Sequence, residues 1–178
     1  MPQRSTQQNP LALRQIWAPW RLEYIKAPRE GGCFLCRAFR ARRDRARGVI
    51  FRGRRCAVLL NRYPYTGGHL MIAPLRHTHS ILSMTPSELN ELMALTRRAI
   101  GWLEKSIQPH GFNVGFNLGE AAGAGLKDHA HLHIVPRWRG DTNFMPVLGR
   151  TNVVPISLDQ LWELLHAVAT GKPRRSRK

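Results

Sequence analysis

Histidines alternate with apolar residues between His129 and Val135, where the sequence reads HAHLHIV. In a β-strand, alternate side chains point to the same face of the sheet. The segment therefore predicts a strand over these residues, with three imidazoles on one face and apolar side chains on the other. Core packing alone cannot satisfy three imidazoles in a row, so the pattern indicates a functional face.

The rest of the chain predicts more strands than helices. A helix capped by Thr85 and Glu88 should end before Pro109, and a second helix should run from Ser157 to Gly171. Short links join most of the strands, which favours an α+β fold, an antiparallel sheet with helices packed on one face. The expected strands cover residues 49–51, 56–60, 69–74, 112–117 and 129–135.

The chain carries a large excess of positive charge. Lys and Arg number 28 against 11 Asp and Glu, which gives a net charge of +17. Nine arginines lie between Arg37 and Arg55, and five of the last seven residues are basic. The excess fits either a polyanionic partner, such as nucleic acid or a phosphorylated metabolite, or an arginine-biased composition with a basic tail. The clustering is typical of a loop and a tail, not of a shaped groove.

The sequence predicts one folded domain in a reducing compartment. It has no apolar run of about eighteen residues to cross a membrane, and residues 1–16 lack the apolar core of a signal peptide. We expect a flexible segment over 1–16, a domain over 17–171, a basic tail over 172–178 and a cytoplasmic location. There, Cys33 and Cys36, spaced C-x-x-C on a turn after two glycines, indicate metal or redox chemistry instead of a disulfide. Because no βαβ pattern surrounds them, no redox cofactor is expected.

The histidine row suits phosphate better than a metal ion of its own. Side chains two residues apart on a flat strand stand about 7 Å apart, which is long for one ion. Imidazole N–H groups donate to phosphate oxygens, and the small-residue loop Gly119–Gly125 could add backbone N–H groups. A nucleophilic imidazole between such donors has the features that phosphoryl or nucleotidyl transfer needs.

These features together resemble the histidine-triad (HIT) family of nucleotide hydrolases and transferases, whose signature is three histidines at alternate positions followed by apolar residues. The resemblance covers about residues 17 to 165 and points to the bacterial branch that acts on diadenosine polyphosphates, which includes hydrolases and phosphorylases. Besides the triad, the matching blocks are residues 61–74, Phe116-Asn117 and residues 136–146.

The resemblance implies catalytic roles for the triad. His131 would be the nucleophile that attacks the α-phosphorus and forms a nucleotidyl-histidine. His133 would donate hydrogen bonds to the phosphate oxygens, and His129 would support the site from the side or bind a metal. Water as the second acceptor would make the enzyme a hydrolase, and phosphate would make it a phosphorylase.

The resemblance also implies substrate-binding residues. Asn61 would hold the ribose hydroxyls, His69 would lie near the nucleotide, and Asn117 would contact the scissile phosphate or the leaving group. Each of two residues also has a purely structural interpretation. Asn61 could serve only as a turn residue, and His69 could serve only as a histidine packed in a strand. Many relatives have a Gln or a hydroxyl residue just before the triad; here the backbone N–H of Gly125 could substitute, and Lys127 is a solvated lysine or an extra charge.

Cys33 and Cys36 have the spacing of half a zinc site. The resemblance supplies His77 and His129 as the other two ligands of a structural zinc, with His79 as the rival of His77. The alternative is a pair of reduced cysteines.

The expected partners are a nucleotide or a dinucleoside polyphosphate, such as diadenosine tetraphosphate, and a second copy of the chain in a homodimer. The homodimer is implied by the resemblance and by the aromatic segment 17–25. The alternatives are a basic nucleic-acid-binding module, a hydrolase of smaller nucleotide conjugates, and a zinc-stabilised scaffold for interactions.

Overall fold

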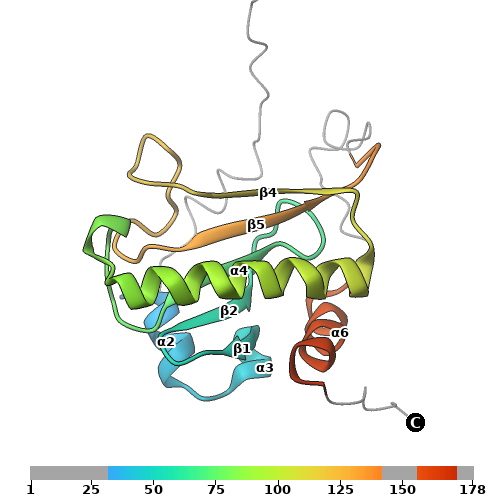
Figure 1. The fold of residues 1–178 in the computed structure, drawn as a ribbon, viewed down its shortest axis with the longest axis horizontal. Coiled ribbons are helices and arrows are strands. Elements are labelled where there is room, and N and C mark those ends of the chain that lie inside the picture. The colour runs from blue at the N-terminus through green and yellow to red at the C-terminus, as the bar shows by residue number, and fades with distance from the viewer. Residues whose placement is uncertain (1–31, 142–155, 172–178) are drawn as a thin grey trace, which may run out of the picture.

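The computed structural model describes residues 32–141 and 156–171. In this part of the chain five strands form one antiparallel sheet in the order β1-β2-β3-β5-β4 (Figure 1). The predicted α+β fold with an antiparallel sheet is confirmed. The strands are β1 (Val49–Arg52), β2 (Cys56–Leu60), β3 (Leu70–Pro74), β4 (Gly111–Phe116) and β5 (Leu132–Arg137).

Two capped helices cover one face of the sheet. In α4 (Pro86–Ile107) the Thr85 side chain accepts from the Glu88 N–H, and the Glu88 carboxylate accepts from the Thr85 N–H at 2.8 Å. The same capping box opens α6 (Leu158–Thr170). Both helices therefore begin and end where the sequence predicts, because the signals that set their ends are local. The shorter elements are α2 (Phe34–Arg40), α3 (Asp44–Arg47) and the 3-10 helix η1 (Ile81–Ser83).

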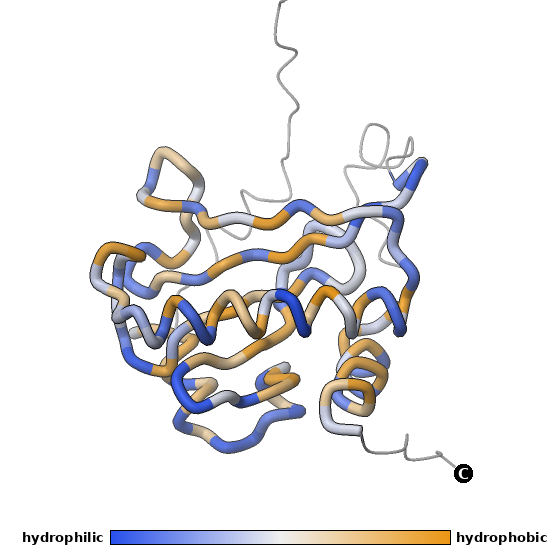
Figure 2. Tube along the Cα trace, in the orientation of Figure 1, coloured by the Kyte–Doolittle hydropathy of each residue, from blue (hydrophilic) through white to orange (hydrophobic). Residues whose placement is uncertain are grey.

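The strands alternate their side chains between two cores. Figure 2 shows that the chain is apolar along much of these strands. One set, which includes Val58, Ile72 and Ile134, packs against α4 and α6. The other set, which includes Leu59 and Met71, packs against α2. Helices α4 and α6 thus pack on one face of the sheet, as predicted, and α2 adds a helix on the opposite face, which the sequence did not predict.

Helix α2 corrects two further predictions. The sequence predicts the C-x-x-C pair on a turn, but Cys33 is the N-cap of α2 and Cys36 lies in its first turn. It also predicts a loop over the arginine-rich stretch, but this stretch forms α2, α3 and part of β1. The physical reason is tertiary: Leu35 and Phe39 of α2 are buried against the sheet, which stabilises a helix too short to persist alone.

The predicted strand over residues 129–135 is wrong in its first half. Strand β5 begins at Leu132 because its pairing with β3 ends there, where Leu132 faces Ile72. Before that point the Ala130 N–H donates to the carbonyl of Thr78, in the loop after β3, at 2.7 Å. Of the triad, only His133 lies in a strand, and His129 and His131 lie in the approach to it.

Antiparallel pairing brings two loops to one end of the sheet. The end of β3, the end of β4 and the start of β5 lie together there. Residues 75–80 therefore meet residues 117–131, which carry the small-residue loop and two triad histidines.

No helix in the described residues is long and apolar enough to cross a membrane. The predicted flexible segment 1–16, the aromatic segment 17–25 and the tail 172–178 lie outside the described residues.

Candidate active site and metal centre

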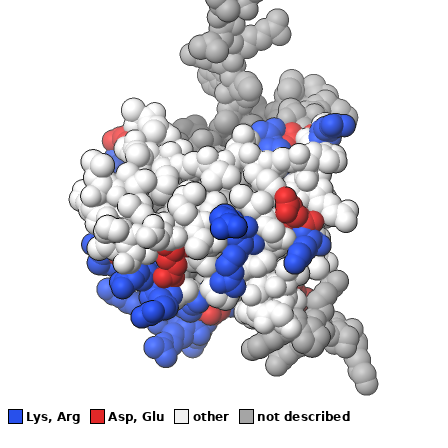
Figure 3. Space-filling model, viewed as in Figure 1, with Lys and Arg blue, Asp and Glu red and all other residues white. Residues whose placement is uncertain are grey.

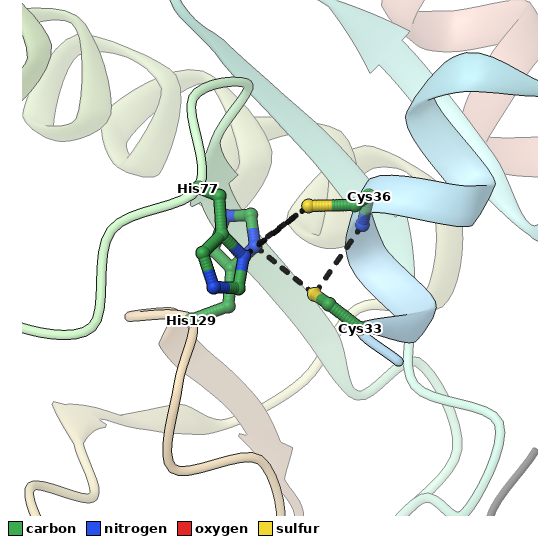
Figure 4. Close-up of side chains that lie close together, drawn as sticks. All are labelled: Cys33, Cys36, His77 and His129. Carbon is green, nitrogen blue, oxygen red and sulfur yellow. Dashed lines mark hydrogen bonds between the residues drawn. The ribbon is translucent and has the colours of Figure 1, made fainter. Parts of the chain in front are cut away.

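Two thiols and two imidazoles converge at the start of α2 (Figure 4). Cys33 Sγ lies 3.2 Å from His129 Nδ1, and Cys36 Sγ lies 3.3 Å from His77 Nδ1. All four ligand atoms lie within 4.8 Å of one another. A tetrahedral zinc with Zn–S of about 2.3 Å and Zn–N of about 2.0 Å would have S···N edges of about 3.5 Å, so the donor set fits such an ion.

The elements that hold the metal cluster also orient its ligands. The Cys33 thiol caps α2 by accepting from the Cys36 N–H at 3.4 Å, which fixes the relative position of the two sulfurs. The His129 Nε2–H donates to the Pro74 carbonyl at 2.8 Å, which leaves Nδ1 as the ligand atom. Burial and the neighbouring Cys33 raise the pKa of Cys36, so a bound cation would be needed to favour the thiolate.

His77, not its rival His79, joins the two cysteines. His79 instead lines the pocket beside His131. The two histidines are separated by one residue, Thr78, so the loop after β3 contributes one imidazole to each of the two sites.

His131 is held as a neutral imidazole with one nitrogen free to react. It is 7% exposed, and burial lowers its pKa, partly offset by its backbone hydrogen bond. Its Nδ1–H donates to the carbonyl of His129 at 2.8 Å, so the lone pair is on Nε2. His129 thus touches both sites, with its side chain in the metal cluster and its backbone carbonyl on His131.

A chain of hydrogen bonds fixes the tautomers of two further histidines. The Tyr65 N–H donates to His69 Nδ1 at 3.2 Å, so the proton of neutral His69 is on Nε2. That Nε2–H donates to His133 Nδ1 at 2.9 Å, so the proton of His133 is on Nε2. Burial, with His133 and His131 nearby, lowers the pKa of His69 to about 3, which keeps it neutral. The His133 ring packs edge-on to that of His131, with centroids 4.7 Å apart, and can donate next to the nucleophile.

A pocket of about 240 Å³ opens beside His131, between the two loops. Asn117, one of the predicted substrate contacts, lines it, and so does Gly119 of the small-residue loop. Gly125, predicted to offer its backbone N–H, does not line this pocket. The lining residues with polar side chains are His79, Ser80, Asn117, Lys127, His129 and His131.

Asn61 and His69 lie on the His133 side, away from the pocket lining. Asn61 Oδ1 accepts from the Tyr63 N–H at 2.9 Å, as the turn alternative expects, and its Nδ2 lies 3.5 Å from His69 Nε2. His69 is fully buried and precedes β3. The structure therefore brings His69 into contact with His133 of the triad and Asn61 close to His69, while Asn61 also shapes its own turn.

Sequence reasoning did not single out Tyr65 or Ser80. The Tyr65 ring stacks on His69 with centroids 4.9 Å apart, and Ser80 lines the pocket. Tyr65 lies within residues 61–74, one of the blocks that resemble the histidine-triad family. That resemblance is the signal from which its role could have been predicted. Ser80 carried no signal, because only the meeting of the two loops places it near His131.

Part of the arginine-rich stretch is used within the fold. Arg45 pairs with Asp159 and Glu163 of α6, and Arg52 pairs with Asp44. Figure 3 shows basic side chains gathered at the lower edge of one face, where Figure 1 places α2, α3 and β1. The stretch thus fastens α3 to its neighbours besides adding positive charge to the surface.

Comparisons with known proteins agree with this architecture. The family model described as the HIT domain matches residues 42–140. A Mycobacterium tuberculosis protein named AP-4-A phosphorylase is 38% identical over 161 residues, which are 86% of this chain and 83% of that protein. A Schizosaccharomyces pombe protein named bis(5'-nucleosyl)-tetraphosphatase (asymmetrical) is 32% identical over 93 residues, 52% of this chain and 50% of that protein.

Solved structures share the fold. A hypothetical histidine triad nucleotide-binding protein from Sulfolobus tokodaii aligns with a TM-score of 0.64 and 21% identity, over 78% of this chain and 93% of that one. A zinc-bound histidine triad family protein from Mycobacterium smegmatis aligns with a TM-score of 0.64 and 23% identity, over 79% of this chain and 94% of that one. On the family-model match and the mycobacterial relative, the chain belongs to the histidine-triad family.

Proposed function

We propose that this protein cleaves dinucleoside polyphosphates through a nucleotidyl-His131 intermediate. The observation that carries the proposal is the hydrogen bond from His131 Nδ1–H to the His129 carbonyl. It leaves the Nε2 lone pair as the nucleophile and stabilises the positive charge that forms on the ring during attack. The names of the mycobacterial and yeast relatives support this substrate class.

In the first step, the Nε2 lone pair of His131 attacks the α-phosphorus. The bond from that phosphorus to the bridging oxygen breaks, and the leaving nucleoside polyphosphate keeps the electron pair. His133 Nε2–H donates to a non-bridging oxygen of the phosphate, since its tautomer is fixed through His69. Asn117 contacts the scissile phosphate or the leaving group, and Asn61 binds the ribose hydroxyls.

In the second step, an acceptor oxygen attacks the same phosphorus and the P–N bond breaks. Its electron pair returns to His131 Nε2. Water would give a nucleoside monophosphate and a proton, and inorganic phosphate would give a nucleoside diphosphate. The name of the mycobacterial relative supports phosphate as the acceptor.

The proposal includes a structural zinc held by Cys33, Cys36, His77 and His129. The donor set supports it, since two thiolates and two imidazoles complete a tetrahedron with no open position. When bound, the ion would supply rigidity, by tying α2 to the segment that presents His131. A title that names a zinc-bound family member adds support.

We also propose that the protein is a homodimer in the cytoplasm. Its domain would cover residues 17–171, preceded by a flexible segment and followed by a basic tail. The match to the mycobacterial relative extends over 86% of the chain, which supports a domain longer than the 42–140 core. Sedimentation of the purified protein would test the dimer.

Product analysis tests the proposed function. Purified protein is incubated with diadenosine tetraphosphate, with and without inorganic phosphate, beside His131→Ala. We expect AMP and ATP without phosphate, or ADP and ATP with it, and no turnover by His131→Ala, whose circular dichroism should match the wild type. Turnover that survives in His131→Ala would refute the intermediate, and an inactive wild type would refute the substrate.

A further inference from the structure

The pocket beside His131 is lined by groups that bind oxyanions, and they come from two different loops. The loop after β3 contributes His79 and Ser80. The loop between β4 and β5 contributes Asn117 and Lys127. Within the described residues, no carboxylate lines this pocket. The lining therefore matches a phosphate group in charge and in hydrogen-bonding capacity.

Two of these groups remain available to a ligand. Ser80 Oγ accepts from the Leu82 N–H at 3.1 Å, which leaves its own O–H to donate. Lys127 pairs with Glu120, whose side chain is 80% exposed. An exposed ion pair of this kind contributes little, so a phosphate in the pocket can compete for the ammonium.

Stereochemistry puts the leaving group and the acceptor on the same side of the α-phosphorus. In-line attack by His131 expels the leaving group from the far side of the α-phosphorus, and the acceptor must enter along that same line. The leaving phosphate and the entering acceptor therefore use one subsite. The pocket of about 240 Å³ is much larger than the roughly 10–15 Å³ that a single water needs, so it has room for a phosphate beyond the α-phosphate.

We propose that His79, Ser80 and Lys127 form an acceptor subsite that binds inorganic phosphate and directs the nucleotidyl group to it instead of to water. The proposal rests on the proposed function. An oxygen of the bound phosphate attacks the α-phosphorus, the P–N bond to His131 breaks, and the nucleotidyl group leaves as a nucleoside diphosphate. Lys127 offsets the repulsion between the two anionic groups, and His79 and Ser80 orient the acceptor.

The ratio of ADP to AMP formed from diadenosine tetraphosphate measures this choice. Because the ratio is set after the intermediate forms, it does not depend on how fast the first step runs in a variant. We expect Lys127→Gln and His79→Gln each to lower the ratio at least about tenfold at a fixed phosphate concentration, the loss typical of a charge-assisted hydrogen bond. Lys105→Gln is the matched control, since it removes the same charge from the exposed last turn of α4.

The outcomes separate the subsite from the proposed function. An unchanged ratio in both variants, with an active wild type and an inactive His131→Ala, would overturn the subsite and leave the nucleotidyl-histidine mechanism intact. AMP as the only new monomer in saturating phosphate would do the same, because the wild type would then select water. No nucleotide products under any condition would overturn both proposals. A lowered ratio that Lys105→Gln does not reproduce would support the subsite.

Discussion

The buried His69 should make the stability of the fold depend on pH. Its imidazole is fully buried and its folded-state pKa is about 3, because burial and the neighbouring His133 and His131 disfavour the charged form. In the unfolded chain the pKa returns to about 6.5. As the pH falls through 6.5 the unfolded state therefore takes up a proton that the folded state does not, and unfolding becomes easier.

The size of this effect follows from the two pKa values. Stability from His69 is fully present above pH 6.5 and is lost at about 1.4 kcal/mol per pH unit as the pH falls toward the folded-state value. Between pH 7 and pH 5 the free energy of unfolding should drop by about 2 kcal/mol on account of this one residue.

Urea unfolding at pH 7 and pH 5 would measure the effect in the wild type and in His69→Gln, whose amide can still donate in place of Nε2–H. The variant should be less stable at pH 7, but its loss between the two pH values should be smaller by about 2 kcal/mol. Groups remote from His69 are present in both proteins, so their contribution cancels in this comparison. His110→Gln is the matched control, because it removes an imidazole at an exposed position. Its loss of stability between pH 7 and pH 5 is compared with that of the wild type. Equal pH dependence in wild type and His69→Gln would refute the account of His69 as a buried neutral donor.

Four further predictions concern the scaffold and the metal cluster. Thr85→Ala removes the capping box of α4 and should lower the free energy of unfolding by about 1 kcal/mol in urea titrations, whereas Thr85→Ser should retain most of it. Leu165→Ala empties a fully buried position in α6 and should cost about 2–5 kcal/mol by the same assay. Cys36→Ser should abolish stoichiometric zinc binding by elemental analysis, and chelation should then lower the melting temperature of the wild type but not of the variant. Because burial raises the pKa of Cys56 to about 12, this thiol should resist alkylation at pH 8 until urea unfolds the chain; labelling at the rate of an exposed cysteine would contradict its burial.

The parts of the fold that could be predicted are those set by local signals. The capping residues Thr85 and Ser157 fix the starts of α4 and α6, and apolar runs mark the strands. Helix α2 could not be predicted, because Cys33 is not a common capping residue and a helix of seven residues is too short to show a clear apolar period. It forms because Leu35 packs against the sheet, and such a contact is decided by tertiary structure.

The candidate site likewise has residues that local motifs predict and residues that only the tertiary structure brings together. Short motifs predict His131 and the cysteine pair as functional residues. The structure places the cysteines with His77 and His129 in a potential metal site, and His131 is held by the His129 carbonyl. The alternation of histidine and apolar residues, however, indicates which way side chains point and not where the backbone pairs with another strand. The sequence therefore predicts a strand from His129, whereas pairing begins at Leu132. The sequence does not predict that the loop after β3 faces the loop before β5 across the pocket. His79 and Lys127 lie far apart in the sequence and come together through the antiparallel pairing of β3 and β5.

Trapping the intermediate tests the central claim most directly. The protein would be mixed with excess diadenosine tetraphosphate in the absence of phosphate and quenched in alkali, where P–N bonds survive, and its peptides analysed by mass spectrometry. We expect one adenylyl group per chain, on the peptide that contains His131, and none in His131→Ala. An adenylyl group on another residue, or steady turnover with no labelled peptide at any time, would contradict covalent catalysis by His131.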